Sequence, residues 1–149
     1  MHTGLLHLHS LLRWVILLLL VFSIVRFLVG WLNKHSFGKR EERLRLFTLI
    51  FSHVQFLVGL VLYFISSVVQ FNDQTMSNKG LRFWAVEHIT MMIIAIVLIT
   101  IGHSKTKRIT DSVKKHRLLT IFFGLALLVI FAAMPWPWRE IIGRPLLRM

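Results

Sequence analysis

Four long apolar stretches, separated by short polar segments, constrain this chain more than any other feature of its sequence. They cover residues 5–31, 44–69, 81–102 and 118–134. Each is near the ~20 residues that a helix needs to cross a hydrocarbon core of ~30 Å. Lipid cannot satisfy backbone groups, so such segments are helical unless strands close a barrel, and the alternating barrel pattern is absent. The sequence predicts an all-α integral membrane protein with a single four-helix domain over residues 1–149.

Basic residues gather in the loops after the first and third stretches. The chain carries 18 Lys and Arg against 6 Asp and Glu, a net charge of +12. The loop after the second stretch holds only Lys79 and Arg82, and the tail adds three arginines, Arg139, Arg144 and Arg148. The positive-inside rule therefore predicts an up-down bundle with the N-terminus and C-terminus on the outer side and the basic loops in the cytoplasm.

The charge of these loops is explained by contact with the anionic headgroups of a lipid bilayer. Apart from Phe37, the basic loops lack the aromatic residues on which bases stack, so no nucleic acid partner is expected. The chain has no cysteine. Disulfides, iron–sulfur clusters and covalently attached haem are thereby excluded, and any metal must be held by His, Met or oxygen atoms.

Three histidines fall inside the apolar stretches, namely His9, His53 and His88. Ionisable side chains at such positions usually face the bundle interior and bind or relay something. The other five histidines lie at or near the ends of the stretches, where we expect solvated imidazoles: His2, His7, His35, His103 and His116.

Counting the rise of a helix sorts the three histidines by depth. His9 lies roughly 6 Å and His88 roughly 10 Å below the outer edge, on helices that run in the same direction. In an up-down bundle the first and third helices are diagonal neighbours, so both imidazoles can approach one cofactor from opposite sides. A haem with two histidine ligands needs this arrangement.

His53 lies about 12 to 14 Å above the inner edge, too deep for the outer pair. Its diagonal partner would be His116, with a vertical mismatch of roughly 10 Å unless that helix begins earlier or tilts. His103 is the other candidate partner. The sequence therefore leaves undecided whether His53 belongs to a second, inner site.

Two charges accompany the outer pair. Arg13 lies one turn below His9, and Glu87 is adjacent to His88; both charges are costly at this depth unless matched. One interpretation is an Arg13–Glu87 ion pair between helices. The other places Arg13 on a haem propionate, with Ser10 or Glu87 orienting a histidine ligand through its second ring nitrogen.

Helix-spaced residues on the second stretch have two interpretations. Ser52, Gly59 and Ser66 form a small-residue seam that would let another backbone approach closely. The neighbouring face carries His53 and three large residues, which more often form plain core than a cofactor wall: Phe56, Leu60 and Tyr63.

The motifs HSLLRW, HVQFLVGLVLYF, RFWAVEHITMM, LITIG and PWPW together resemble a family of small bacterial four-helix membrane proteins labelled cytochrome b. The resemblance covers nearly the whole chain. It implies non-covalent haem b with histidine ligation in a bacterial inner membrane, with His9, His53 and His88 as ligands. A second haem with two histidine ligands needs a fourth histidine within the spans, which is missing unless His116 supplies it.

Three functions follow as expectations. The first is a b-type haem protein that carries electrons between quinol and a partner complex, without substrate chemistry of its own. The second is an accessory subunit of a larger membrane complex, which would use the Ser52, Gly59 and Ser66 seam to bind a foreign helix. The third is a proton relay through Glu87, His88 and His53, against which stands the lack of broken helices.

Overall fold

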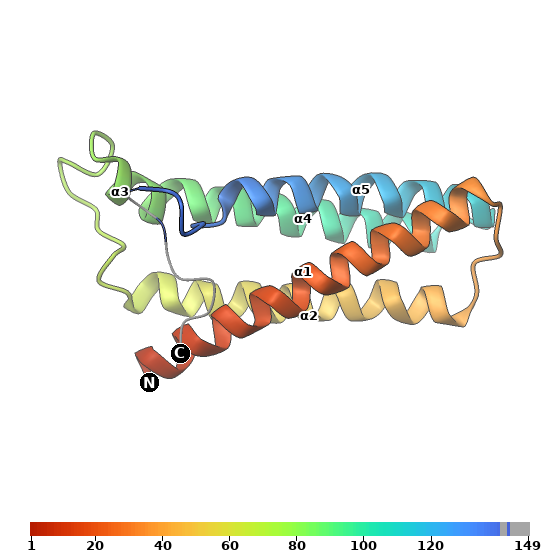
Figure 1. Ribbon diagram of the computed structural model, residues 1–149, viewed down its shortest axis with the longest axis horizontal. Coiled ribbons are helices and arrows are strands. Elements are labelled where there is room, and N and C mark those ends of the chain that lie inside the picture. Colours follow the sequence, from red (N-terminus) through yellow and green to blue (C-terminus); the bar gives the residue numbers. More distant parts are fainter. Residues whose placement is uncertain (141–142, 144–149) are drawn as a thin grey trace.

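The computed structural model describes residues 1–140 and 143, and four long helices form a bundle in it (Figure 1). These helices are α1 (His2–Leu32), α2 (Lys39–Ile65), α4 (His88–Lys107) and α5 (Ser112–Ala133). A short helix, α3 (Lys79–Arg82), and a π-helical turn, η1 (Phe83–Glu87), run directly into α4. All four helical segments are long and apolar enough to cross a membrane. The prediction of an all-α multi-pass membrane protein is confirmed at this level.

Successive long helices run antiparallel. The N-terminus, the connection from α2 to α3 and the end of α5 all lie at one end of the bundle in Figure 1. The main contacts of α1 are with α2 and α5, and those of α4 are also with α2 and α5. Consequently α1 and α4 are diagonal to each other, as the up-down prediction requires. Arg144 and Arg148, which the charge argument counted on the outer side, lie outside the described residues.

Two helices begin earlier than the hydropathy pattern predicts, because each has a capping side chain. Before α2, the Glu41 carboxylate accepts a hydrogen bond from the Gly38 N–H at 2.9 Å. Before α5, Asp111 accepts from the Val113 N–H at 3.0 Å. Each cap satisfies an N–H that the first turn of a helix leaves without a partner. At its other end α2 stops at Ile65 rather than at residue 69.

The expectation that His103 and His116 are solvated is wrong. The early start of α5 places His116 in its second turn, where it is 1% exposed, and His103 in α4 is 4% exposed. The ring of His116 lies against Phe37 and Phe27, with centroid separations of 5.1 and 6.1 Å. The hydropathy pattern ended the third stretch at residue 102 and began the fourth at residue 118, whereas α4 runs to Lys107 and α5 begins at Ser112, so both histidines lie within helices.

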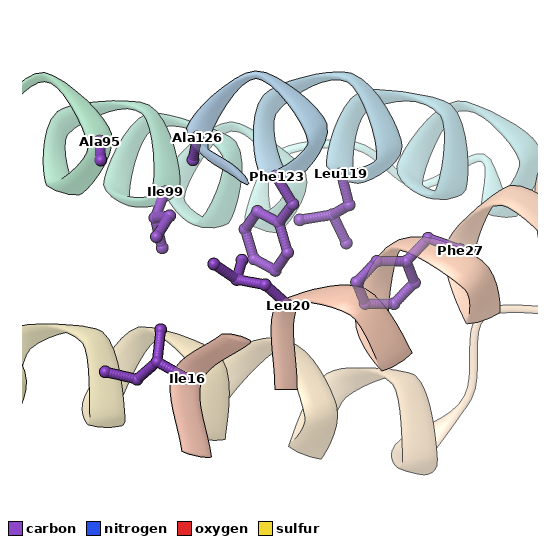
Figure 2. Close-up of a cluster of buried hydrophobic side chains, with 8 residues drawn as sticks. All are labelled: Ile16, Leu20, Phe27, Ala95, Ile99, Leu119, Phe123 and Ala126. Carbon is purple, nitrogen blue, oxygen red and sulfur yellow. The ribbon is translucent and has the colours of Figure 1, made fainter. Parts of the chain in front are cut away.

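The apolar core lies between α1, α4 and α5 (Figure 2). Leu20 and Phe27 of α1 pack there with Ile99 of α4 and with Leu119 and Phe123 of α5, all fully buried. The second long helix contributes none of the buried members of this cluster. Its own buried residues are mostly polar or charged: Glu41, Arg45, Thr48, Ser52 and Leu62.

Hydrogen bonds along the whole of α2 join it to the other helices. In membrane proteins such bonds contribute about 0.6 kcal/mol on average and up to about 1.7 kcal/mol each. From the N-terminal to the C-terminal end of α2 they are Arg26–Glu41 at 2.8 Å, Arg45 to the His103 carbonyl at 3.1 Å, Ser23–Thr48 at 3.0 Å, Gln55 to the His9 carbonyl at 2.9 Å and Tyr63 to the Ala85 carbonyl at 2.6 Å.

Replacing Gly30 by alanine tests the close contact between α1 and α5. A Cβ at Gly30 would lie 2.3 Å from Cε1 of His116, whose ring is enclosed and has no room to move aside. We expect Gly30→Ala to lower the free energy of unfolding by about 1–3 kcal/mol, measured by titrating a denaturing detergent into micelles.

The matched control is Gly124→Ala in α5, where a Cβ meets nothing within 4 Å. Alanine is the better helix former, so this variant should be unchanged or more stable by up to about 1 kcal/mol. Equal stability of the two variants would contradict the proposed contact.

Candidate cofactor site

A cavity of about 190 Å³ lies between α1, α2 and the helical segment that contains His88. Its walls are mainly aliphatic and aromatic, and the end of α5 contributes Met134 and Pro135. A few polar side chains reach it: His9 and Arg13 from α1, Ser52 and Gln55 from α2, and His88 from α4. An apolar cavity with a small number of convergent polar groups is typical of a ligand or cofactor site.

His88 is the first residue of α4 and is oriented by the end of α5. Its Nδ1 lies 2.9 Å from the carbonyl oxygen of Ala133. A carbonyl only accepts, so Nδ1 carries the proton and Nε2 keeps its lone pair. Trp84 and Phe83 lie beside the ring, at centroid separations of 5.8 and 5.6 Å. Histidines that bind metals usually donate their other N–H to such a carbonyl, so the contact suits a ligand.

The π-helical turn just before His88 sets the position of this residue. The His88 N–H bonds to the carbonyl of Phe83, five residues earlier. Across the cavity the Tyr63 hydroxyl donates to the Ala85 carbonyl within the turn, at 2.6 Å. Turns of this kind are rare and frequently occur at functional sites. The sequence offered no signal for it, because residues 83–87 contain neither proline nor glycine.

The imidazole ring of His9 packs against α2. A Cβ at Gly59 would come 3.0 Å from Cε1 of the ring, so the missing side chain of Gly59 makes room for the imidazole. The Gln55 amide donates from Nε2 to the backbone oxygen of His9 at 2.9 Å. Both the ring and the backbone of His9 are therefore positioned by one face of α2.

Arg13 lines the same cavity one turn further along α1. Its guanidinium donates to Ser10 Oγ at 3.3 Å and lies 5.5 Å from the ring centroid of Trp14. A guanidinium at this depth favours an anionic group nearby, and its planar fork suits a carboxylate.

Glu87 does not share this environment. Its carboxylate pairs with Nε of Arg82 at 2.8 Å, and its side chain is 41% exposed. Among the described residues it is not part of the cavity lining. The structure thus pairs Glu87 with Arg82, where one interpretation of the sequence paired it with Arg13.

The buried polar atoms at the cavity without a hydrogen-bond partner among the described residues include His9 Nδ1, Ser52 Oγ and Gln55 Oε1. A buried polar atom without a partner costs about 1–3 kcal/mol, so each needs an explanation. Their gathering at one cavity fits a site that is completed by a bound group or by ordered water.

His53 lies outside this cavity as far as the described residues show. Its Nδ1 is 2.8 Å from the Leu49 carbonyl, and its Nε2 is 3.5 Å from the Thr100 hydroxyl. His116 lies elsewhere, with Nε2 3.4 Å from the Ser36 carbonyl. The two face different helix pairs, α2–α4 and α1–α5. Within the described ranges, no three His, Asp or Glu side chains are grouped to hold a metal ion.

Gln55 is the site residue that the sequence argument missed. It is spaced three residues after Ser52 and four before Gly59, a helical signal for a shared face. Ser52, Gly59 and Ser66 all line the cavity, so this seam faces the bundle interior, where His9 occupies the space above Gly59.

No family model, curated protein or solved structure matches this chain. The chemistry of the site is therefore inferred from its own residues.

Removing the Tyr63 hydroxyl tests how the C-terminal end of α2 is held at the cavity. Tyr63→Phe leaves the Ala85 carbonyl without this donor, so we expect the free energy of unfolding in micelles to fall by about 0.6–1.7 kcal/mol. Amide hydrogen exchange should accelerate over residues 83–87. Unchanged exchange there would show that the hydroxyl does not support the turn.

Proposed function

We propose that this protein is a membrane-embedded b-type haem protein that relays electrons, with His9 and His88 as the two ligands of one haem. The observation that carries the proposal is that imidazoles from two diagonal helices line one apolar cavity, and that one already donates Nδ1–H to a backbone carbonyl. Such a contact fixes the tautomer and the ring orientation of a metal ligand.

The residues present fit haem b in composition as well as in placement. The aliphatic and aromatic walls suit a porphyrin, and Arg13 supplies a cation for a propionate carboxylate. A bound haem would supply one-electron transfer between its two iron states. The protein's part is to hold the two imidazoles, exclude water and balance charge through Arg13. Non-covalent binding agrees with a chain that lacks cysteine.

A second haem at His53 has weaker support. With His116 as its partner, the ligands would have to come from two different helix interfaces. His103 is closer to His53, since it lies one turn after Thr100 on α4 and Thr100 contacts His53. We therefore propose one haem, in the cavity of His9 and His88.

The accessory-subunit alternative was based on a small-residue seam that could bind a foreign helix. That seam faces the cavity, so it is not available on the outside of the bundle. The proposed proton relay requires Glu87, His88 and His53 to form one connected path. Glu87 instead pairs with Arg82, and His53 contacts Thr100. An electron carrier between quinol and a partner complex is the function we retain. We propose a bacterial inner membrane, as the family resemblance implies, and the positive-inside rule supports a haem nearer the periplasm.

Cysteine labelling tests this orientation, and a chain without native cysteine gives no background. We expect Asp73→Cys, between α2 and α3, to react in intact cells with a maleimide that cannot cross membranes. Thr110→Cys, between α4 and α5, should react only after the cells are lysed. The reverse labelling pattern would show that the topology is the opposite of the one proposed.

Reduced-minus-oxidised spectra of the purified protein test haem binding. Wild type expressed with ample haem should show a b-type α-band and one haem per chain. His9→Gln and His88→Gln should each lose most of that haem, because each removes an iron ligand. The matched control is His35→Gln at an exposed position, which should keep it. A wild-type protein without the α-band would refute the proposal.

A further inference from the structure

The two imidazoles at the cavity differ in the hydrogen bonding of Nδ1, the ring nitrogen that would not bind the iron. His88 has an acceptor for its Nδ1–H in the Ala133 carbonyl. The Nδ1 of His9 is buried and has no partner among the described residues. A histidine that binds through Nε2 carries its proton on Nδ1, and that proton needs an acceptor in a medium without water.

Gln55 carries a suitable acceptor at the right place. Its Nε2 already donates to the backbone oxygen of His9, which fixes the end of the amide that faces α1. The other end, Oε1, is buried and without a partner among the described residues. The His9 ring lies over Gly59, one helical turn from Gln55 on the same face of α2. The His9 Nδ1–H donor and the Gln55 Oε1 acceptor thus lie about one helical turn apart along α2, and each lacks a hydrogen-bond partner among the described residues.

We infer that Gln55 Oε1 accepts the hydrogen bond of His9 Nδ1–H and holds His9 in the tautomer that presents Nε2 to the cavity. Both atoms lack a partner in the structure, so the inferred bond needs the His9 ring to turn while the Gln55 bond to the His9 carbonyl stays in place. Gln55 is then a positioning residue that acts through His9, with the role that the Ala133 carbonyl has for His88. The inference rests on the proposed haem ligation for its purpose, but the tautomer itself does not depend on haem.

Ser52 is the competing acceptor, because its Oγ also lacks a partner among the described residues. It is seven residues from Gly59, two helical turns from the position of the His9 ring. A serine in a helix can also bond to the carbonyl four residues earlier, an option that Gln55 Oε1 lacks. Gln55 is favoured because it alone already contacts the backbone of His9.

The direct test is the tautomer of each histidine in the haem-free protein, read from nitrogen-15 chemical shifts in detergent micelles at a pH where the imidazoles are neutral. In wild type, His9 and His88 should both carry the proton on Nδ1. Gln55→Leu should remove this preference at His9 and leave His88 unchanged. Gln55→Glu loses the amide donor to the His9 carbonyl but keeps an oxygen acceptor, so it should keep the wild-type tautomer. An unchanged His88 in each variant shows that the bundle is folded.

Two controls locate the effect. Gln70→Leu makes the same change at an exposed glutamine, whose amide bonds to the Ser67 carbonyl, and it should change neither histidine. Ser52→Ala should also leave His9 unchanged. A wild-type His9 protonated on Nε2, or a tautomer that responds to Ser52→Ala but not to Gln55→Leu, would overturn the inference.

The haem-loaded protein supplies a second readout. Losing an orienting partner of a ligand typically lowers metal affinity by about 10–100-fold, and we expect a haem affinity loss of that size for Gln55→Leu. The reduction potential should rise, because a less electron-rich imidazole stabilises the ferric iron less. Gln70→Leu should alter neither quantity.

The outcomes separate the two proposals. If wild type binds no haem, the proposed function fails and the tautomer still decides the role of Gln55. If haem binds and Gln55→Leu leaves the tautomer, affinity and potential at wild-type values, the role of Gln55 fails and the proposed function stands.

Discussion

The hydrogen bonds that attach α2 to the other helices are the interactions on which the rest of the structure depends. Lipid tails are as apolar as leucine, so helices in a membrane associate through packing and polar contacts. Helices α1, α4 and α5 share an apolar core, to which α2 adds only partly buried side chains, Leu44, Leu49 and Phe51. Most of the fully buried side chains of α2 are polar or charged. Its contact with α4 is the least extensive among the four neighbouring pairs of long helices. The cavity lies where this packing is loosest.

The site follows from that arrangement. One face of α2 seats the His9 ring over Gly59 and binds its backbone through Gln55, while Tyr63 secures the π-helical turn that precedes His88. The end of α5 then orients His88 through the Ala133 carbonyl. Each histidine is positioned by a helix other than its own. This explains how a small bundle can present two imidazoles to one cavity, and why the polar atoms left without partners gather there.

The sequence predicted the class of fold because its cause is simple: apolar stretches of membrane-spanning length have few structural solutions. The sequence also predicted that His9, Arg13 and His88 lie near one another, because the depth of each residue follows from the rise per residue and the direction of its helix. It could not predict the surroundings of Glu87, because a π-helical turn shifts side chains without a sequence marker. His116 was misplaced because a single capping residue, Asp111, starts α5 earlier than hydropathy suggests. The role of Gln55 depends on contact between two helices, which no pattern within one helix reports.

Locating iron in the protein tests the central claim most directly. Crystals of the haem-loaded protein, measured at the iron absorption edge, would give an anomalous signal at each iron site. We predict one strong peak in the cavity, between the Nε2 atoms of His9 and His88 and within coordination distance of both. A peak beside His53 or His116 in its place, or no iron in protein purified with ample haem, would contradict the account.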